Sequence, residues 1–122
     1  EQALIQRYLD VNDLTSEVTS SGLHYIVTQE GDGNFPNENS NVTVNYVGTL
    51  LNGQEFDAND DITFSLQQVI AGWTEALLMM QEGDKWKLIV PPELGYGAAG
   101  VGPIPGNTTL VFEVELIAVR GR

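Results

Sequence analysis

Residues 69–80 read VIAGWTEALLMM, and this segment decides how the rest of the chain is arranged. The apolar residues Ile70, Trp73, Leu77 and Met80 recur three to four positions apart. That spacing places side chains on one face of an α-helix. The segment therefore predicts one amphipathic helix over 69–80, in the middle of the chain.

On both sides of this helix, apolar and polar residues alternate, which is typical of β-strands. Alternation predicts strands over residues 23–27, 42–48, 86–90 and 110–116, extended chain over 54–57 and a shorter strand over 62–66. The dipeptide Asn52-Gly53 predicts a hairpin turn. Antiparallel strands with a single central helix predict an α+β fold, in which a curled antiparallel sheet, or half-barrel, wraps over that helix.

A short helix is also predicted at the N-terminus, over residues 2–12. Leu4, Ile5 and Leu9 belong to its apolar stripe, and a polar linker is predicted over residues 13–22. A helix on such a linker either docks or swings freely. The stripe favours packing against the core over a site for a partner.

The composition excludes several functions. The 17 acidic and 5 basic residues give a net charge of −12, which repels phosphate backbones, so nucleic acid is not an expected partner. The chain has no cysteine and a single histidine, His24, which excludes a disulfide and a zinc cage. We expect no metal and no cofactor, and we expect His24 to be a structural residue of a strand.

One glycine motif invites a nucleotide-binding interpretation. Gly95-Tyr96-Gly97-Ala98-Ala99-Gly100 matches the dinucleotide fingerprint G-x-G-x-x-G. That fingerprint has to open a helix, whose free N–H groups bind the pyrophosphate. Here Pro103 and Pro105 follow, and they cannot continue a helix. The sequence therefore predicts a Gly- and Pro-rich loop over 95–106.

The aromatic residues carry the functional signal. They fall on separate predicted elements or on the loops beside them: Tyr46, Phe56, Phe64, Trp73, Tyr96 and Phe112. Each residue alone is expected in the core. Together they can line an apolar cup, and a cup with a few polar groups is the usual form of a small-ligand site.

Four segments resemble, in order, the signatures of the FKBP family of peptidyl-prolyl cis–trans isomerases. They are Val44-Asn45-Tyr46-Val47-Gly48-Thr49-Leu50 with Gly53 and Phe56-Asp57, Val69-Ile70-Ala71-Gly72-Trp73-Thr74-Glu75-Ala76-Leu77, Pro92-Glu93-Leu94-Gly95-Tyr96-Gly97 with Ile104-Pro105, and Leu110-Val111-Phe112-Glu113-Val114-Glu115-Leu116. The resemblance implies an isomerase domain over residues 20–122. The N-terminal helix and linker over 1–19 precede it.

The resemblance also implies the activity, rotation of X-Pro peptide bonds, and the residues that perform it. The catalytic residues it implies are Tyr46, Phe56, Asp57, Trp73, Tyr96 and Phe112. Trp73 would be the floor beneath the substrate proline, Tyr96 would donate its hydroxyl to the substrate carbonyl, and Ile70 would donate its backbone N–H. The substrate-binding residues it implies are Val69, Ile70 and Ile104, with Ile62 or Phe64 at a further wall position.

Two segments depart from the family pattern. Residues 58–61 look shortened, and they carry Asp60 and Asp61 where many relatives have a basic residue that can pair with the aspartate at Asp57. The loop over 98–106 is also slightly short. These departures leave the role of Asp57 open.

Partners and location follow only from the resemblance. It implies proline-containing unfolded or nascent polypeptides as substrates, macrolides as inhibitors, and a monomer. The alternative function is an FKBP-like binding or chaperone module with weak or no isomerase activity. The acidic charge and the N-terminal helix resemble exported bacterial members, which implies the cell envelope, periplasmic or lipid-anchored, with the cytoplasm as the alternative. The residues from Glu1 onward lack the basic start and apolar middle of a signal peptide.

Overall fold

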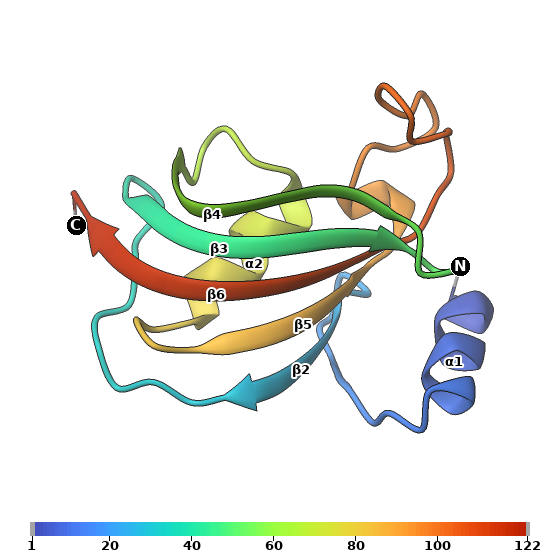
Figure 1. The fold of residues 1–122 in the computed structure, drawn as a ribbon, viewed down its shortest axis with the longest axis horizontal. Helices are drawn as coiled ribbons and strands as arrows, with labels where there is room; N and C mark the ends of the chain where they lie inside the picture. The colour runs from blue at the N-terminus through green and yellow to red at the C-terminus, as the bar shows by residue number, and fades with distance from the viewer. Residues whose placement is uncertain (1, 122) are drawn as a thin grey trace.

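The alternating segments form one antiparallel sheet in the computed structural model, which describes residues 2–121 (Figure 1). The strands are β1 Glu17–Val18, β2 His24–Gln29, β3 Asn41–Leu50, β4 Glu55–Ser65, β5 Lys85–Val90 and β6 Leu110–Arg120; the helices are α1 Gln2–Val11, α2 Ala71–Met79 and the short 3-10 turn η1 Pro92–Leu94. The order across the sheet is β1-β2-β5-β6-β3-β4, and each neighbouring pair is antiparallel. This arrangement confirms the α+β prediction.

Helix α2 lies across one face of the sheet and closes the main core (Figure 1). Its buried residues Trp73 and Leu77 pack against the inward-facing side chains of the strands, such as Leu88. The helix begins two residues later than the sequence predicts, because Ile70 adopts an extended conformation (φ −61°, ψ 153°) as its N-cap. The positions before the helix are thereby free to form part of a site.

Helix α1 packs on the opposite face of the sheet. Ile5 and Leu9 are buried, and they form a second apolar cluster with Ile89 and Val111. Alternate side chains of a strand point to opposite faces, so Ile89 faces away from α2, whereas Leu88 faces it. Helix α1 is therefore docked, and the predicted apolar stripe is in part core. No helix within residues 2–121 is long and apolar enough to cross a membrane.

His24 joins α1 to the sheet. Its Nδ1 lies 2.7 Å from Ser16 Oγ, and its Nε2 lies 2.7 Å from Gln2 Oε1, both within hydrogen-bonding distance. Gln2 Nε2 also donates to the carbonyl of Gly22 at 3.2 Å. Burial lowers the pKa of His24 below its usual value. These contacts give His24 a structural role in strand β2.

The predicted polar linker over residues 13–22 is wrong in one respect, because it contains strand β1. Glu17 pairs with Tyr25, and Val18 pairs with His24, at the edge of the sheet. A two-residue edge strand with both side chains exposed has no apolar alternation. The sequence pattern therefore carried no signal for it.

The predicted separation of 54–57 from 62–66 is also wrong. Residues 55–57 and 62–65 belong to the single strand β4, and residues 58–61, which look like a shortened connection in the sequence, lie within it. Most side chains of β4 are exposed, because it is an edge strand of the sheet. Exposure removes the apolar alternation by which its middle could have been predicted.

A β-bulge in the middle of β4 sets which of its residues face the core. The register against β3 shifts between Val44 and Tyr46, so that Tyr46 pairs with Asn59. Asp61 takes a left-handed conformation (φ 55°), and its N–H donates to Asn45 Oδ1 at 2.8 Å. The bulge thereby places Asn59 beside the ring of Tyr46.

Candidate active site

Trp73 lies at the centre of an aromatic box. Three rings stand nearly perpendicular to its indole: Tyr46 at a centroid distance of 5.0 Å and 85°, Phe112 at 5.3 Å and 85°, and Phe64 at 5.7 Å and 88°. Edge-to-face pairs of this kind contribute about 0.5–1.5 kcal/mol each beyond the burial of area. The indole N–H has no hydrogen-bond partner within residues 2–121, so apolar packing rather than a hydrogen bond holds the indole in place.

A second bulge and a glycine bring Phe56 to this box. The register between β3 and β4 moves from the pair Gly48–Asp57 to Thr49–Glu55, which leaves Phe56 as the extra residue. Its ring packs edge-to-face on Phe112 at 5.6 Å. A Cβ at Gly48 would lie 2.7 Å from Phe56 Cζ and 2.8 Å from a ring carbon of Phe112. Gly48 therefore makes room for the contact between the two rings.

Polar groups occupy one wall of the box. The hydroxyl of Tyr46 donates to Asp57 Oδ2 at 2.6 Å and accepts from Asn59 Nδ2 at 3.0 Å. Burial, and next the bond to Asp57, raise the pKa of Tyr46 above its usual value. Burial, and next the charge of Asp57, raise the pKa of Tyr96 in the same direction. Both phenols are therefore protonated at neutral pH and can act as donors.

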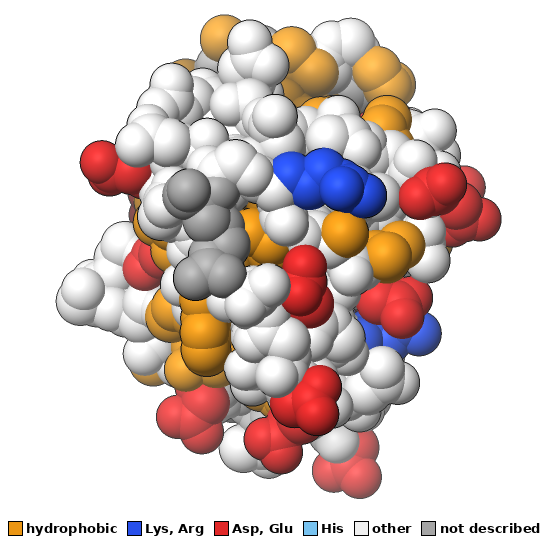
Figure 2. Space-filling model, turned by 90° about the vertical axis from the view of Figure 1, so that its left-hand side faces the viewer, with side chains coloured by type: hydrophobic (Ala, Val, Ile, Leu, Met, Phe, Trp, Pro, Cys, Tyr) orange, Lys and Arg blue, Asp and Glu red, His pale blue; other side chains and the backbone are white. Residues whose placement is uncertain are grey.

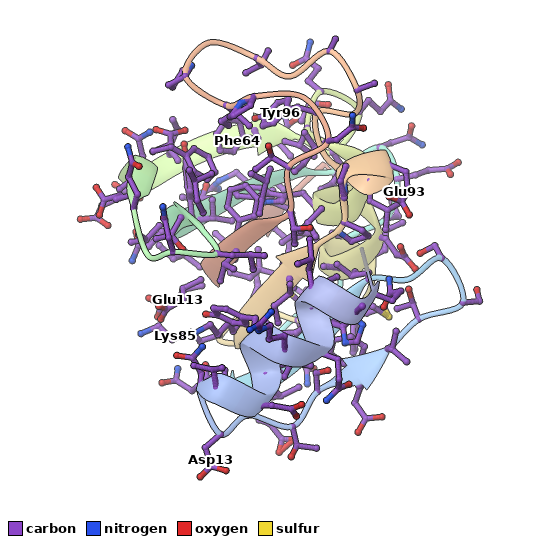
Figure 3. The ribbon with its side chains drawn as sticks, turned by 90° about the vertical axis from the view of Figure 1, so that its right-hand side faces the viewer. Asp13, Phe64, Lys85, Glu93, Tyr96 and Glu113 are labelled. Atoms are coloured by element: carbon purple, nitrogen blue, oxygen red, sulfur yellow. The ribbon has the colours of Figure 1, made fainter. Side chains whose placement is uncertain are left out.

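These side chains surround an open cavity of about 380 Å³. It is lined by Tyr46, Asp57, Phe64, Gln68, Val69, Ile70, Trp73, Tyr96 and Phe112. The structure thus brings together most of the residues that the resemblance implies. Figure 3 shows Phe64 and Tyr96 close to each other beneath the loop that follows β5.

Three of the predicted site residues do not line this cavity. Phe56 packs edge-to-face on Phe112, Ile62 packs against the main core, and Ile104 is buried in that core. Sequence reasoning missed Gln68, which lines the cavity, and Asn59, which holds the hydroxyl of Tyr46. Gln68 could have been suspected from its place directly before Val69. Asn59 could not, because the bulge determines where it faces.

The loop over 95–106 covers the site and opens no helix. Val101 and Ile104 bridge each other through two backbone hydrogen bonds of 3.0 and 2.8 Å, and Gly100 N–H donates to the carbonyl of Tyr96 at 3.2 Å. Gly100 adopts φ 70°, and a Cβ there would lie 2.3 Å from the carbonyl oxygen of Ile104. The tight turn that this glycine allows fixes the loop beside Tyr96. Its geometry does not suit a pyrophosphate, which needs a helix N-terminus.

The cavity has few ionisable side chains among its lining residues. Asp57 is its only carboxyl group among the lining residues, and His24 does not line it. No group of three or more His, Asp or Glu side chains within residues 2–121 could hold a metal ion. The aromatic residues of the lining can bind an apolar ring on the indole of Trp73, with a few hydrogen-bond donors around it.

Comparison with known proteins gives the class to which this fold and site belong. The sequence profile of FKBP-type peptidyl-prolyl cis–trans isomerases matches residues 32–117. The chain therefore belongs to the FKBP-type peptidyl-prolyl cis–trans isomerase family.

Two similar proteins of known sequence come from bacteria. The chain is 48% identical over 108 residues to the FKBP-type peptidyl-prolyl cis–trans isomerase FkpA of Escherichia coli K12, which covers 85% of this chain and 40% of the relative. It is 44% identical over 108 residues to the outer membrane protein MIP of Legionella longbeachae, covering 84% of this chain and 46% of the relative. The chain thus spans less than half the length of these two relatives.

Solved structures agree with the fold. The crystal structure of FkpA from Escherichia coli superposes with a TM-score of 0.88 at 43% identity, covering 96% of this chain and 57% of that one. A peptidyl-prolyl cis–trans isomerase from Pseudomonas syringae superposes with a TM-score of 0.85 at 38% identity, covering 93% and 89% of the two chains. The sheet curled over α2 is therefore the FKBP fold.

Proposed function

We propose that this chain catalyses the cis–trans isomerisation of X-Pro peptide bonds in the cavity over Trp73. The observation that carries the proposal is the aromatic box itself, an indole floor framed by three perpendicular rings. A proline ring is small and apolar enough to rest on that floor. Tyr96 then donates its hydroxyl to the substrate carbonyl, and Ile70 donates an N–H that no helical hydrogen bond uses, because it precedes the first turn of α2.

The chemistry needs no proton transfer. Resonance in the C–N bond sets a barrier of about 18–20 kcal/mol, and it also draws charge onto the amide oxygen. The twisted transition state has lost this resonance and is less polar, so water stabilises the planar ground state more. An apolar cavity removes that solvation and lowers the barrier.

The size of each contribution to lowering the barrier shows that no single residue is sufficient. A million-fold acceleration needs about 8 kcal/mol, at about 1.36 kcal/mol for each tenfold. One well-placed donor contributes about 3–4 kcal/mol at most. Tyr96 alone is therefore insufficient, and desolvation together with a twisted bound pose supplies the remainder. In this mechanism, Tyr46 and Asp57 form the polar wall of the cavity.

The substrates we propose are proline-containing unfolded or nascent polypeptides, and macrolides with a proline-like ring are the inhibitors we propose. We also propose a monomer in the bacterial cell envelope. The relative named outer membrane protein MIP supports that location. We also propose that residues 1–19 form an N-terminal helix with its linker and that residues 20–122 form the isomerase domain.

A turnover assay on a Leu-Pro peptide tests the proposal. Exchange between the cis and trans peptide, followed by NMR with the protein in catalytic amount, should accelerate well above the uncatalysed rate. Acceleration that is lost when a macrolide fills the cavity would place the reaction there. Binding of the peptide without acceleration would instead favour the binding or chaperone module.

A further inference from the structure

The cavity is built entirely from parts of the chain that carry no cation. Between Arg7 and Lys85, and again between Lys87 and Arg120, the sequence contains no lysine or arginine. Every residue that lines the cavity falls within these two segments. A carboxylate at the cavity therefore has no basic neighbour along the chain.

The two lysines of β5 lie on the other face of the sheet. Trp86, between them, is buried in the core under α2, and successive side chains of a strand alternate between faces. Lys87 Nζ lies 5.5 Å from the ring centroid of Tyr8 on α1, and Lys85 shares a shallow depression with Glu113. Figure 3 shows Lys85 beside Glu113, away from Tyr96. Neither lysine is placed to neutralise the cavity.

Asp57 supplies the negative charge at the cavity. Its carboxylate is exposed, and one oxygen, Oδ2, accepts from Tyr46. Its charge contributes to the raised pKa of Tyr96, so the carboxylate and that hydroxyl belong to the same part of the site. Asp60 instead lines the depression that contains Lys85 and Glu113, so Asp57 is the one acidic residue among those that line the cavity. Over the face drawn in Figure 2, acidic side chains are widely spread while basic ones are confined to small areas.

We propose that Asp57 makes this site selective for proline peptides with a lysine or arginine next to the proline. The proposal rests on the proposed isomerase function and names its substrate class. With proline on Trp73, the neighbouring substrate side chain lies at the mouth of the cavity, where Asp57 is exposed. The charge pair stays in contact with water, so the preference is modest and sensitive to salt.

The test compares peptides that differ in one charge. Lys-Pro is paired with norleucine-Pro, and Pro-Lys with Pro-norleucine, and kcat/KM is measured for each. We expect the lysine peptide of at least one pair to be favoured by about three- to fivefold at low ionic strength, and the preference to vanish near 1 M salt, where the screening length is about 3 Å. Equal kcat/KM within both pairs, with turnover of Leu-Pro intact, overturns the selectivity and leaves the isomerase function standing. Absence of turnover for every peptide overturns both.

Two variants distinguish the effect of Asp57 on this preference from the effect of the protein's overall charge. Asp57→Asn keeps the shape and an acceptor for Tyr46, and the ratio of the two kcat/KM values cancels any general loss of activity. We expect this ratio to fall to about one in Asp57→Asn and to stay at the wild-type value in Glu113→Gln, which removes the same charge from the other face. Equal falls in both variants would mean that the overall field, rather than Asp57, sets the preference. Should Asp57→Asn not fold, Glu113→Gln still decides the question, because a wild-type ratio in that variant supports Asp57 and a fall in it overturns the proposal.

Discussion

Trp73 and Trp86 provide a matched pair for testing the site. Both side chains are buried, at 4% and 6% exposure, and both indole N–H groups lack a partner within residues 2–121. Only Trp73 lines the cavity, whereas Trp86 stacks on Tyr25 at a centroid distance of 4.6 Å. We predict that Trp73→Leu and Trp86→Leu both destabilise the fold, and that only Trp73→Leu reduces isomerase activity.

The ring contacts set the magnitude of the destabilisation. Trp73 makes three edge-to-face contacts, so its loss removes about 1.5–4.5 kcal/mol of ring interaction. Leucine keeps part of the apolar volume, which limits the free-energy cost to about 3–4 kcal/mol for Trp73→Leu and about 2–3 kcal/mol for Trp86→Leu. A domain of this size has a free energy of unfolding of about 5–15 kcal/mol, so both variants should remain folded without denaturant.

Urea unfolding and a proline-peptide assay, run on the same preparations, measure the two effects. We expect kcat/KM to fall at least about tenfold in Trp73→Leu, equivalent to about 1.36 kcal/mol of transition-state stabilisation, and to change less than about twofold in Trp86→Leu. A folded Trp73→Leu protein with wild-type kcat/KM would refute the assignment of the floor. An equal loss in Trp86→Leu would show that activity follows stability rather than the cavity.

Three further predictions follow from individual contacts. Gly48→Ala should force the rings of Phe56 and Phe112 apart, at a cost of about 1–3 kcal/mol in urea unfolding and with reduced kcat/KM; an unchanged midpoint and rate would show that the rings yield freely. The pKa of His24 is lowered in the folded state, so the unfolded state binds more protons as the pH falls. The contribution of His24 to the free energy of unfolding is therefore full above about pH 6.5 and is lost as the pH falls below that value. The melting temperature of the wild type should therefore drop more between about pH 7.5 and 5.5 than that of His24→Gln, and parallel curves would contradict this role. A macrolide should quench the fluorescence of Trp73 and compete with peptide; calorimetry showing no binding while turnover is intact would mean that the cavity has a different shape.

The sequence predicted the fold where burial enforces a period. Helix α2 and strands β3, β5 and β6 face the core, so their apolar residues recur regularly. The edge strands β1 and β4 are largely exposed, and their patterns carry no such constraint. That is why β1 appeared as a linker and why β4 appeared as two pieces.

The site was predictable to the extent that its residues lie on regular elements. Trp73 and Phe112 follow from the periods of α2 and β6, and the resemblance adds Tyr96 on the loop. Two bulges in β4 decide the rest, because they place Phe56 against Phe112 and Asn59 beside Tyr46. A bulge shifts every following side chain by one position, and alternation in one sequence does not reveal where that shift occurs.

The most direct test of the central claim is the pH profile of kcat/KM for wild type, Tyr96→Phe and His24→Ala between about pH 6 and 8. Tyr46 and Tyr96 have raised pKa values, so both hydroxyls stay protonated throughout that range. Rotation driven by desolvation predicts flat profiles for all three proteins, with Tyr96→Phe lowered by no more than about a hundred- to a thousandfold. A bell-shaped wild-type profile that becomes flat in His24→Ala would demonstrate proton transfer and contradict the mechanism.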